Sequence, residues 1–99
     1  IMGDLLCLCT LKKRFFMIKY MVEILSVDVN LTCEGGETPL IICAEHNFPD
    51  IALFLLSSGA DANCNNYLLS DSSNSPAQIS ASWQHLKVLY YLIIYNAKT

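Results

Sequence analysis

A four-residue pattern that returns after 33 positions constrains the fold of this chain more than any other feature. Residues 27–30 read Val-Asp-Val-Asn, and residues 60–63 read Ala-Asp-Ala-Asn. Other identities occur at the same offset: Gly3 with Gly36, Phe15 with Phe48, and Ile18 with Ile51. An internal period of this length indicates a repeat architecture. The sequence therefore predicts repeated units that stack on one another.

A third unit follows after an insertion of four residues. Ser75-Pro76-Ala77 takes the place of Thr38-Pro39-Leu40, and Leu92 matches Leu55. We therefore expect one domain, residues 1–99, with units of about 1–33, 34–66 and 67–99. Since the chain starts with Ile1 and stops just after Ala97, we expect it to be a fragment of a longer array.

The middle unit has the clearest local signals for helix ends. Thr38 can cap a helix through its side-chain oxygen, and Pro39 suits the first helical position because a missing N–H costs nothing there. Asn47 tolerates the left-handed conformation that ends a helix, and Gly59 stops a second helix. The unit is expected to be a helix, a tight loop, a second helix and an extended exit segment.

These residues resemble the ankyrin repeat family. The middle unit carries its signature in order: Gly36, Thr38-Pro39-Leu40, Ala44 and Gly59-Ala60-Asp61-Ala62-Asn63. The resemblance implies an all-α solenoid of helix-loop-helix repeats with hairpin loops between them. The first unit departs from the pattern, with Leu5-Leu6 in place of Thr-Pro and Arg14 in place of the loop glycine.

Composition and charge narrow the partners and the compartment. Net charge is −3, and residues 34–66 contain acidic residues but no lysine or arginine, which argues against nucleic acid as a partner. The longest strongly apolar run, residues 88–95, is far shorter than the ~20 residues that span a bilayer, so no membrane partner is expected. Five cysteines do not make a closed disulfide framework and favour an intracellular location, cytoplasmic or nuclear.

No reaction centre is evident in the sequence. Cys7 and Cys9 align with Leu40 and Ile42, and two residues that are two apart on a helix point about 200° from each other. His46 and His85 lack the spacing of zinc ligands, and there is no Gly-x-Ser-x-Gly motif. We expect no catalysis, no cofactor and no metal. A Cys/His metal or redox site is kept as a second alternative.

The resemblance implies that a concave side, built from hairpin tips and first helices, binds another protein. By position, the candidate contacts are Glu34, Glu37, Ile41, Glu45, Asn65, Asn66, Tyr67, Gln78, Ser82 and Trp83. Ile41 replaces the histidine of the family's Thr-Pro-Leu-His. The glutamates suggest a partner with a basic segment. An adaptor or scaffold segment is the favoured function, and a structural spacer within a larger enzyme or receptor is the alternative.

Two features of the third unit bear on its exposure. Trp83 aligns with Lys13 and His46; it is either an exposed interface anchor or folded back over residues 67–74. Residues 88–95 carry no charge, although a terminal repeat needs a polar outer face. We therefore expect further repeats, a partner or a second copy to cover Tyr90 and Ile94.

Overall fold

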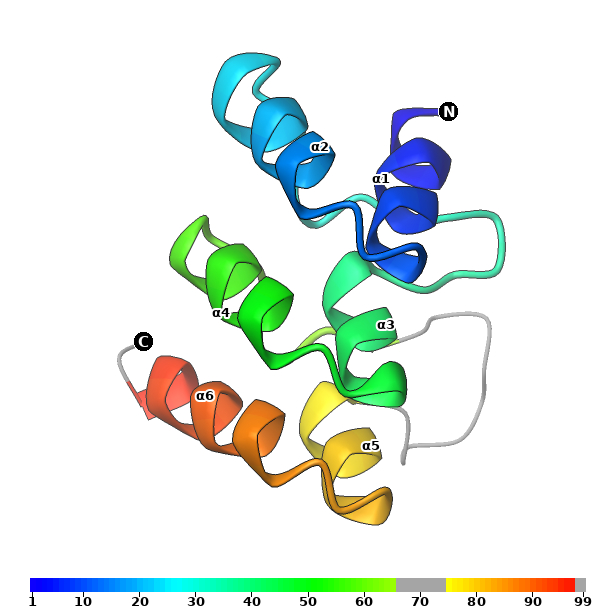
Figure 1. Cartoon of the computed structure of the whole chain (residues 1–99). Coiled ribbons are helices and arrows are strands. Elements are labelled where there is room, and N and C mark those ends of the chain that lie inside the picture. The colour runs from blue at the N-terminus through cyan, green and yellow to red at the C-terminus, as the bar shows by residue number, and fades with distance from the viewer. Residues whose placement is uncertain (66–74, 98–99) are drawn as a thin grey trace.

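Three pairs of helices stack side by side in the computed structural model, which describes residues 1–65 and 75–97 (Figure 1). Unit 1 contains α1 (Met2–Leu11) and α2 (Phe15–Lys19), and α2 continues directly into a π-helix, η1 (Tyr20–Ile24). Unit 2 contains α3 (Pro39–His46) and α4 (Pro49–Ser57). Unit 3 contains α5 (Pro76–Ser82) and α6 (Leu86–Ala97). The predicted all-α stack of helix pairs is confirmed.

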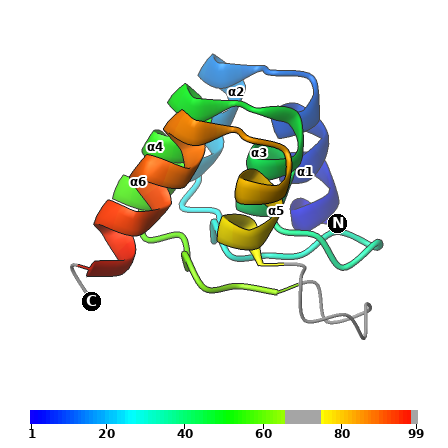
Figure 2. The ribbon, with the colours of Figure 1, turned by 90° about the horizontal axis from the view of Figure 1, so that it is seen from below.

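The helices form two layers with the core between them. The first helices α1, α3 and α5 make one layer, and the second helices α2, α4 and α6 make the other (Figure 2). Side chains that are almost completely buried run through all three units: Leu6, Ile18, Met21, Leu40, Leu55, Val88 and Leu92. Each unit therefore buries its apolar residues against its neighbours, as in a solenoid.

The helix ends of unit 2 follow the local signals in the sequence. Thr38 Oγ1 accepts a hydrogen bond from the backbone N of Ile41 at 3.3 Å, and Pro39 is the first residue of α3. Asn47 has φ 59° and Gly59 has φ 101°, so both adopt the left-handed region that ends a helix. The predicted caps and stops of this unit are confirmed.

Unit 1 differs from its predicted register by one residue at its first helix. The left-handed residue that ends α1 is Lys13, with φ 57°, and not Arg14. The residue before the second helix also bonds back to an equivalent carbonyl in each unit. These bonds join Arg14 N to Cys9 O (2.8 Å), Phe48 N to Cys43 O (3.1 Å) and His85 N to Ser80 O (2.8 Å). Cys9 therefore matches Cys43, an offset of 34 and not 33.

The π-helix η1 restores the offset of 33 further along the chain. Ser26, with φ 56°, occupies the position of Gly59, so unit 1 has one residue more than unit 2 in this stretch. Leu25 N bonds to the Tyr20 carbonyl five residues back, at 3.1 Å, where an α-helix bonds four back. The corrected register aligns Cys7 with Ile41, and it aligns Trp83 with Lys12 and His46.

The recurring Asp-x-Asn pattern joins neighbouring units. Asp28 Oδ1 accepts a hydrogen bond from Asn30 N at 2.9 Å, and Asp61 Oδ1 accepts one from Asn63 N at the same distance. The Asn30 side chain then reaches unit 2, where Nδ2 donates to the Gly59 carbonyl at 3.2 Å and Oδ1 accepts from Asp61 N at 2.7 Å. The pattern recurs because each exit segment is tied to the next.

Candidate interaction surface

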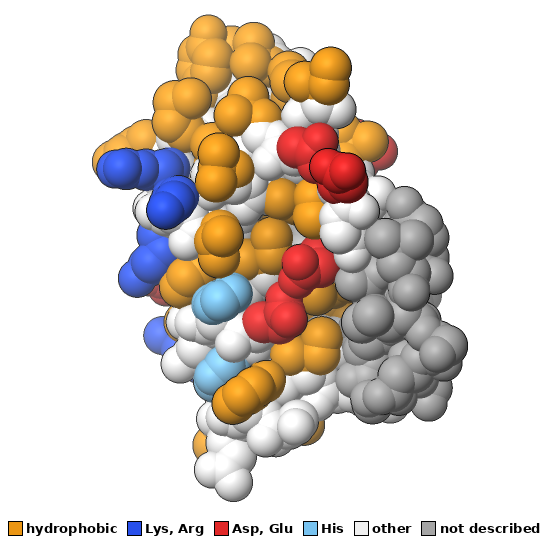
Figure 3. All heavy atoms as spheres, turned by 90° about the vertical axis from the view of Figure 1, so that its right-hand side faces the viewer, with side chains coloured by type: hydrophobic (Ala, Val, Ile, Leu, Met, Phe, Trp, Pro, Cys, Tyr) orange, Lys and Arg blue, Asp and Glu red, His pale blue; other side chains and the backbone are white. Residues whose placement is uncertain are grey.

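The hairpin side is the surface formed by the first helices and the loops that lead into them (Figure 3). Within the loop before α3, Cys33 N donates to the Glu37 carbonyl at 2.9 Å, and Gly36 N donates to the Cys33 carbonyl at 2.8 Å. Gly36 has φ 83°, a conformation that favours glycine. Asp4 Oδ1 on α1 accepts from Glu34 N at 2.8 Å. The loop and its two glutamates are therefore held against unit 1.

Acidic side chains gather on the hairpin side, while basic side chains lie along one edge of the same view (Figure 3). Glu34 is exposed, and Glu37 and Glu45 are half-buried. Burial, a hydrogen bond with Glu37 and the charge of that group together raise the pKa of the Glu45 carboxyl to about 8. Glu45 therefore holds its proton to a higher pH than an exposed glutamate does.

One predicted contact, Ile41, is not on the surface. Its side chain is only 2% exposed, so the prediction that it contacts a partner is wrong. The equivalent residue in unit 1, Cys7, is also buried and lies against the following hairpin, where its Sγ donates to the Glu37 carbonyl at 3.6 Å. In unit 1, this position therefore packs the first helix against the hairpin that precedes α3.

The other predicted contacts fall into two groups. Exposed side chains, besides Glu34, are Asn65, Gln78, Ser82 and Trp83, whereas Asn66 and Tyr67 lie outside the described residues. Gln78 also closes a capping box, since Ser75 Oγ accepts from Gln78 N at 3.3 Å and Gln78 Oε1 accepts from Ser75 N at 3.4 Å. Gln78 is therefore less free to reorient than its exposure alone suggests.

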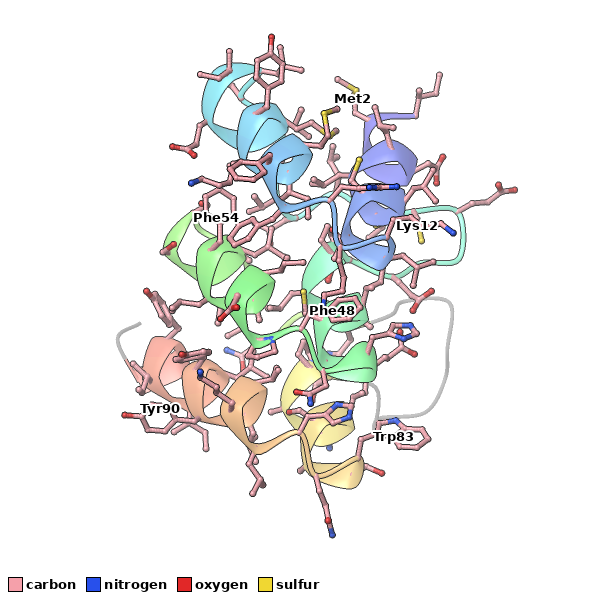
Figure 4. All side chains as sticks on the ribbon, in the orientation of Figure 1. Met2, Lys12, Phe48, Phe54, Trp83 and Tyr90 are labelled. Carbon is pink, nitrogen blue, oxygen red and sulfur yellow. The ribbon has the colours of Figure 1, made fainter. Side chains whose placement is uncertain are left out.

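Trp83 points away from the helices at the end of α5 (Figure 4) and is 66% exposed. Its ring stacks on His85, with centroids 6.4 Å apart and an interplanar angle of 15°. His85 Nδ1 lies 2.7 Å from the Ala44 carbonyl, and because a carbonyl only accepts, Nδ1 must carry the proton. This bond from unit 3 to α3, which the sequence did not reveal, fixes the surface on which Trp83 rests.

The cysteines have features of packing residues rather than reactive ones. Burial raises the pKa of Cys7 to about 12 and also raises the pKa of Cys43 and Cys64. These thiols stay protonated at neutral pH, and the thiolate is the reactive form. Among the residues that the structure describes, no group of three or more His, Cys, Asp or Glu side chains could hold a metal ion. Nor does any helix in this part have the length and apolar character to cross a membrane.

The two ends of the stack carry apolar side chains on their outer surfaces. Tyr90 is 60% exposed and Ile93 is 58% exposed, whereas Ile94 is half-buried. Ile93 therefore replaces Ile94 as the outward residue of α6. The outer surface of unit 1 is also apolar, a feature that the sequence analysis did not predict. Its exposed residues include Leu5, Leu8, Phe16, Met17 and Tyr20.

Comparison with known proteins agrees with this arrangement. A family model described as ankyrin repeats, in three copies, matches residues 6–99. The search of curated proteins found no match. Ankyrin repeats are generally modules for protein–protein interaction and are generally not catalytic. The match covers almost the whole chain. The chain belongs to the ankyrin repeat family.

Proposed function

We propose that this chain is a recognition module, an adaptor or scaffold segment, that binds a partner protein through its hairpin side. The observation that carries the proposal is the pair Glu37 and Glu45, two carboxyl groups within hydrogen-bonding reach of each other, on a surface that also presents the exposed Glu34. Trp83, at the far end of this side, is exposed and supported from beneath by His85. Exposed tryptophans on a rigid support often anchor interfaces.

The acidic pair favours a partner that presents a basic segment. A lysine or arginine placed beside Glu37 would stabilise the charged form of Glu45 and lower its pKa. Binding would then release the proton that Glu45 holds in the free protein. An arginine has the better geometry, because its guanidinium can bond to two carboxylate oxygens at once. Affinity should therefore rise as the pH approaches 8 and fall with added salt.

A peptide library displayed on phage tests the proposal directly. Selection against the immobilised 99-residue chain at about pH 8 should enrich peptides that contain arginine or lysine. Those peptides should lose at least about tenfold in affinity, measured by titration calorimetry, on the double variant Glu37→Gln/Glu45→Gln. The matched control is Asp50→Asn, which removes one exposed carboxylate from the second-helix layer and should leave the affinity unchanged.

The same selection separates recognition from a purely structural role. A spacer with no binding surface of its own would enrich no consistent sequence, and that result would overturn the proposal. Enriched peptides that bind the double variant as tightly as the wild type would place the binding surface elsewhere. Trp83→Ala should weaken the same peptides while leaving the melting temperature nearly unchanged, because this side chain is mostly in solvent.

A further inference from the structure

The outer surface of unit 1 has the same residue types as the surfaces that are buried between units. Four apolar positions in unit 2 are buried or half-buried: Pro39, Ile42, Ile51 and Phe54. With the offset of 34, their equivalents in unit 1 are Leu5, Leu8, Met17 and Tyr20, which are between 43% and 50% exposed. These four residues define the N-terminal face. They are all apolar or aromatic, so the N-terminal face has the residue types of a surface between two units.

The contact made by Phe54 shows what such a position does inside the stack. Its ring lies edge-on against Phe15 of the preceding unit, with centroids 5.7 Å apart and an interplanar angle of 68°. Figure 4 shows Phe54 between the second helices of units 1 and 2. Tyr20 holds the equivalent position in unit 1 and is half exposed. If a further unit stacked on the N-terminal face, its residue equivalent to Phe15 would contact Tyr20.

Unit 3 presents the complementary surface at the other end. The residue equivalent to Phe15 in unit 3 is Leu86, which is exposed at the start of α6. Two other positions are buried in unit 2 because the next unit covers them, Ala44 and Leu56. Their equivalents in unit 3, Ala81 and Ile93, are exposed. Leu86, Ala81 and Ile93 define the C-terminal face.

The residue sizes on the C-terminal face also match those of an internal surface. Ala81 keeps the alanine of Ala44 on the first helix, where a small side chain lets the next first helix approach. Ile93 keeps the branched apolar side chain of Leu56 on the second helix. An exposed apolar surface of this kind is typical of a protein interaction site. Within the chain, the surface that packs on such a face is the N-terminal side of the next unit.

We propose that the C-terminal face of one chain stacks on the N-terminal face of a second copy, head to tail. Tyr20 then packs on Leu86 of the partner subunit, as Phe54 packs on Phe15 within the chain. The contact continues the interface that already joins units 1, 2 and 3. Because the two faces differ, each added copy leaves one face open, and the assembly grows with concentration instead of stopping at a symmetric dimer. The hairpin side stays uncovered, so this contact is independent of the proposed recognition site.

Sedimentation velocity of the 99-residue chain tests the proposal. Wild type should shift from monomer toward dimers and longer species as the concentration rises to the order of 100 µM and above. Tyr20→Lys damages only the N-terminal face, and Ile93→Lys damages only the C-terminal face. Each variant alone should remain monomeric, because every contact needs one intact face of each kind. An equimolar mixture of the two variants should form a 1:1 dimer and no longer species.

Three results would overturn the proposal. A wild type that stays monomeric at about 500 µM would show that the faces do not associate at a useful affinity. A variant that still dimerises alone would indicate a symmetric contact between like faces. A mixture that stays monomeric, while both variants retain the helical circular dichroism of wild type, would exclude head-to-tail pairing. The control Glu37→Gln, on the hairpin side, should associate like wild type.

Discussion

Unit 2 and unit 1 reach the same helix-loop-helix shape by different means. Unit 2 has a side-chain cap at Thr38, and Asn47 and Gly59 at its two left-handed positions. Unit 1 has no side-chain cap on α1, and its left-handed residues are Lys13 and Ser26, which adopt this region at a cost. Packing against unit 2, more than local preference, therefore holds unit 1 in its shape.

The π-helix is the clearest sign of this dependence. One extra residue between Arg14 and Ser26 is taken up in η1, while Ile18 and Met21 remain almost completely buried. A short π-helix within an α-helix costs energy relative to a regular helix. Keeping both apolar side chains in the core offsets that cost. Stacking can therefore impose the helix-loop-helix shape on a sequence that lacks the local signals for it.

The greatest loss of stability is expected when a core side chain of unit 2 or unit 1 is truncated. Leu55 and Met21 occupy equivalent positions and are at most 1% exposed. Leu55→Ala should lower the free energy of unfolding by about 3 kcal/mol, since Leu55 lies in the unit with neighbours on both sides. Met21→Ala should cost about 2 kcal/mol, because it lies in an end unit and methionine packs more adaptably. Urea unfolding followed by circular dichroism measures both. Equal losses would mean that unit 1 is not the more loosely packed of the two.

A smaller effect is expected at the helix caps. Thr38→Ala removes the acceptor for Ile41 N and a contact of 3.3 Å with Cys64 Sγ, and it should cost about 1 kcal/mol. Thr38→Ser keeps the oxygen and should cost less. Asp4 is the equivalent residue in unit 1, but it bonds to Glu34 N and not to its own helix. Asp4→Ala should therefore cost about 0.5 kcal/mol. A larger loss at Asp4 than at Thr38 would contradict the comparison of the two units.

The fold and the helix ends of unit 2 could be predicted because their signals are local. The capping threonine, the helix-starting proline and the glycine stop each act within a few residues. The register of unit 1 could not be predicted, because an extra residue inside a helix leaves no mark in composition. The offset is 34 up to Met21, within η1, and is 33 again at Ser26 and Asp28.

The exposure of the predicted contact residues could be foreseen from the sequence at some positions and not at others. Glu34 and Trp83 are charged or large side chains at positions next to a turn, and both are exposed. Ile41 is 2% exposed, and its burial depends on packing between elements, for which its own stretch of sequence has no local signal. Ile93 and Ile94 could not be separated, because α6 has no charge to mark its solvent side and adjacent helical residues differ by about 100° in direction.

The left-handed helix ends offer a pair of changes with opposite signs. Ser26 adopts φ 56° without the freedom of glycine, so Ser26→Gly should stabilise the fold by about 0.5 kcal/mol. Gly59→Ala should destabilise it by about 1 kcal/mol. A Cβ added at Gly59 would meet nothing within 4 Å, so this loss reports backbone conformation alone. Losses for both variants would show that Ser26 makes contacts that compensate for its strained backbone.

The smallest effect concerns Glu45, which occupies the position held by Leu11 in unit 1. Its pKa in the folded chain, about 8, lies above the ordinary value of 4.5, so the folded chain binds one more proton than the unfolded chain between those values. The free energy of unfolding should therefore fall as the pH rises through this window. The half-buried carboxyl still contacts water, which limits the loss to about 1 kcal/mol or less.

Glu45→Gln tests this by removing the titration while keeping the shape of the side chain. The variant should lose less stability than wild type between about pH 5 and pH 8.5, and Asp50→Asn should lose as much as wild type. Leu11→Glu places a carboxyl at the equivalent position in unit 1, where Gly3 occupies the position of Glu37 and carries no carboxyl group. It should add a smaller pH-dependent loss than Glu45 itself. If it adds an equal or larger loss, Glu37 is not a cause of the raised pKa, and the acidic pair loses its place as the centre of the recognition surface.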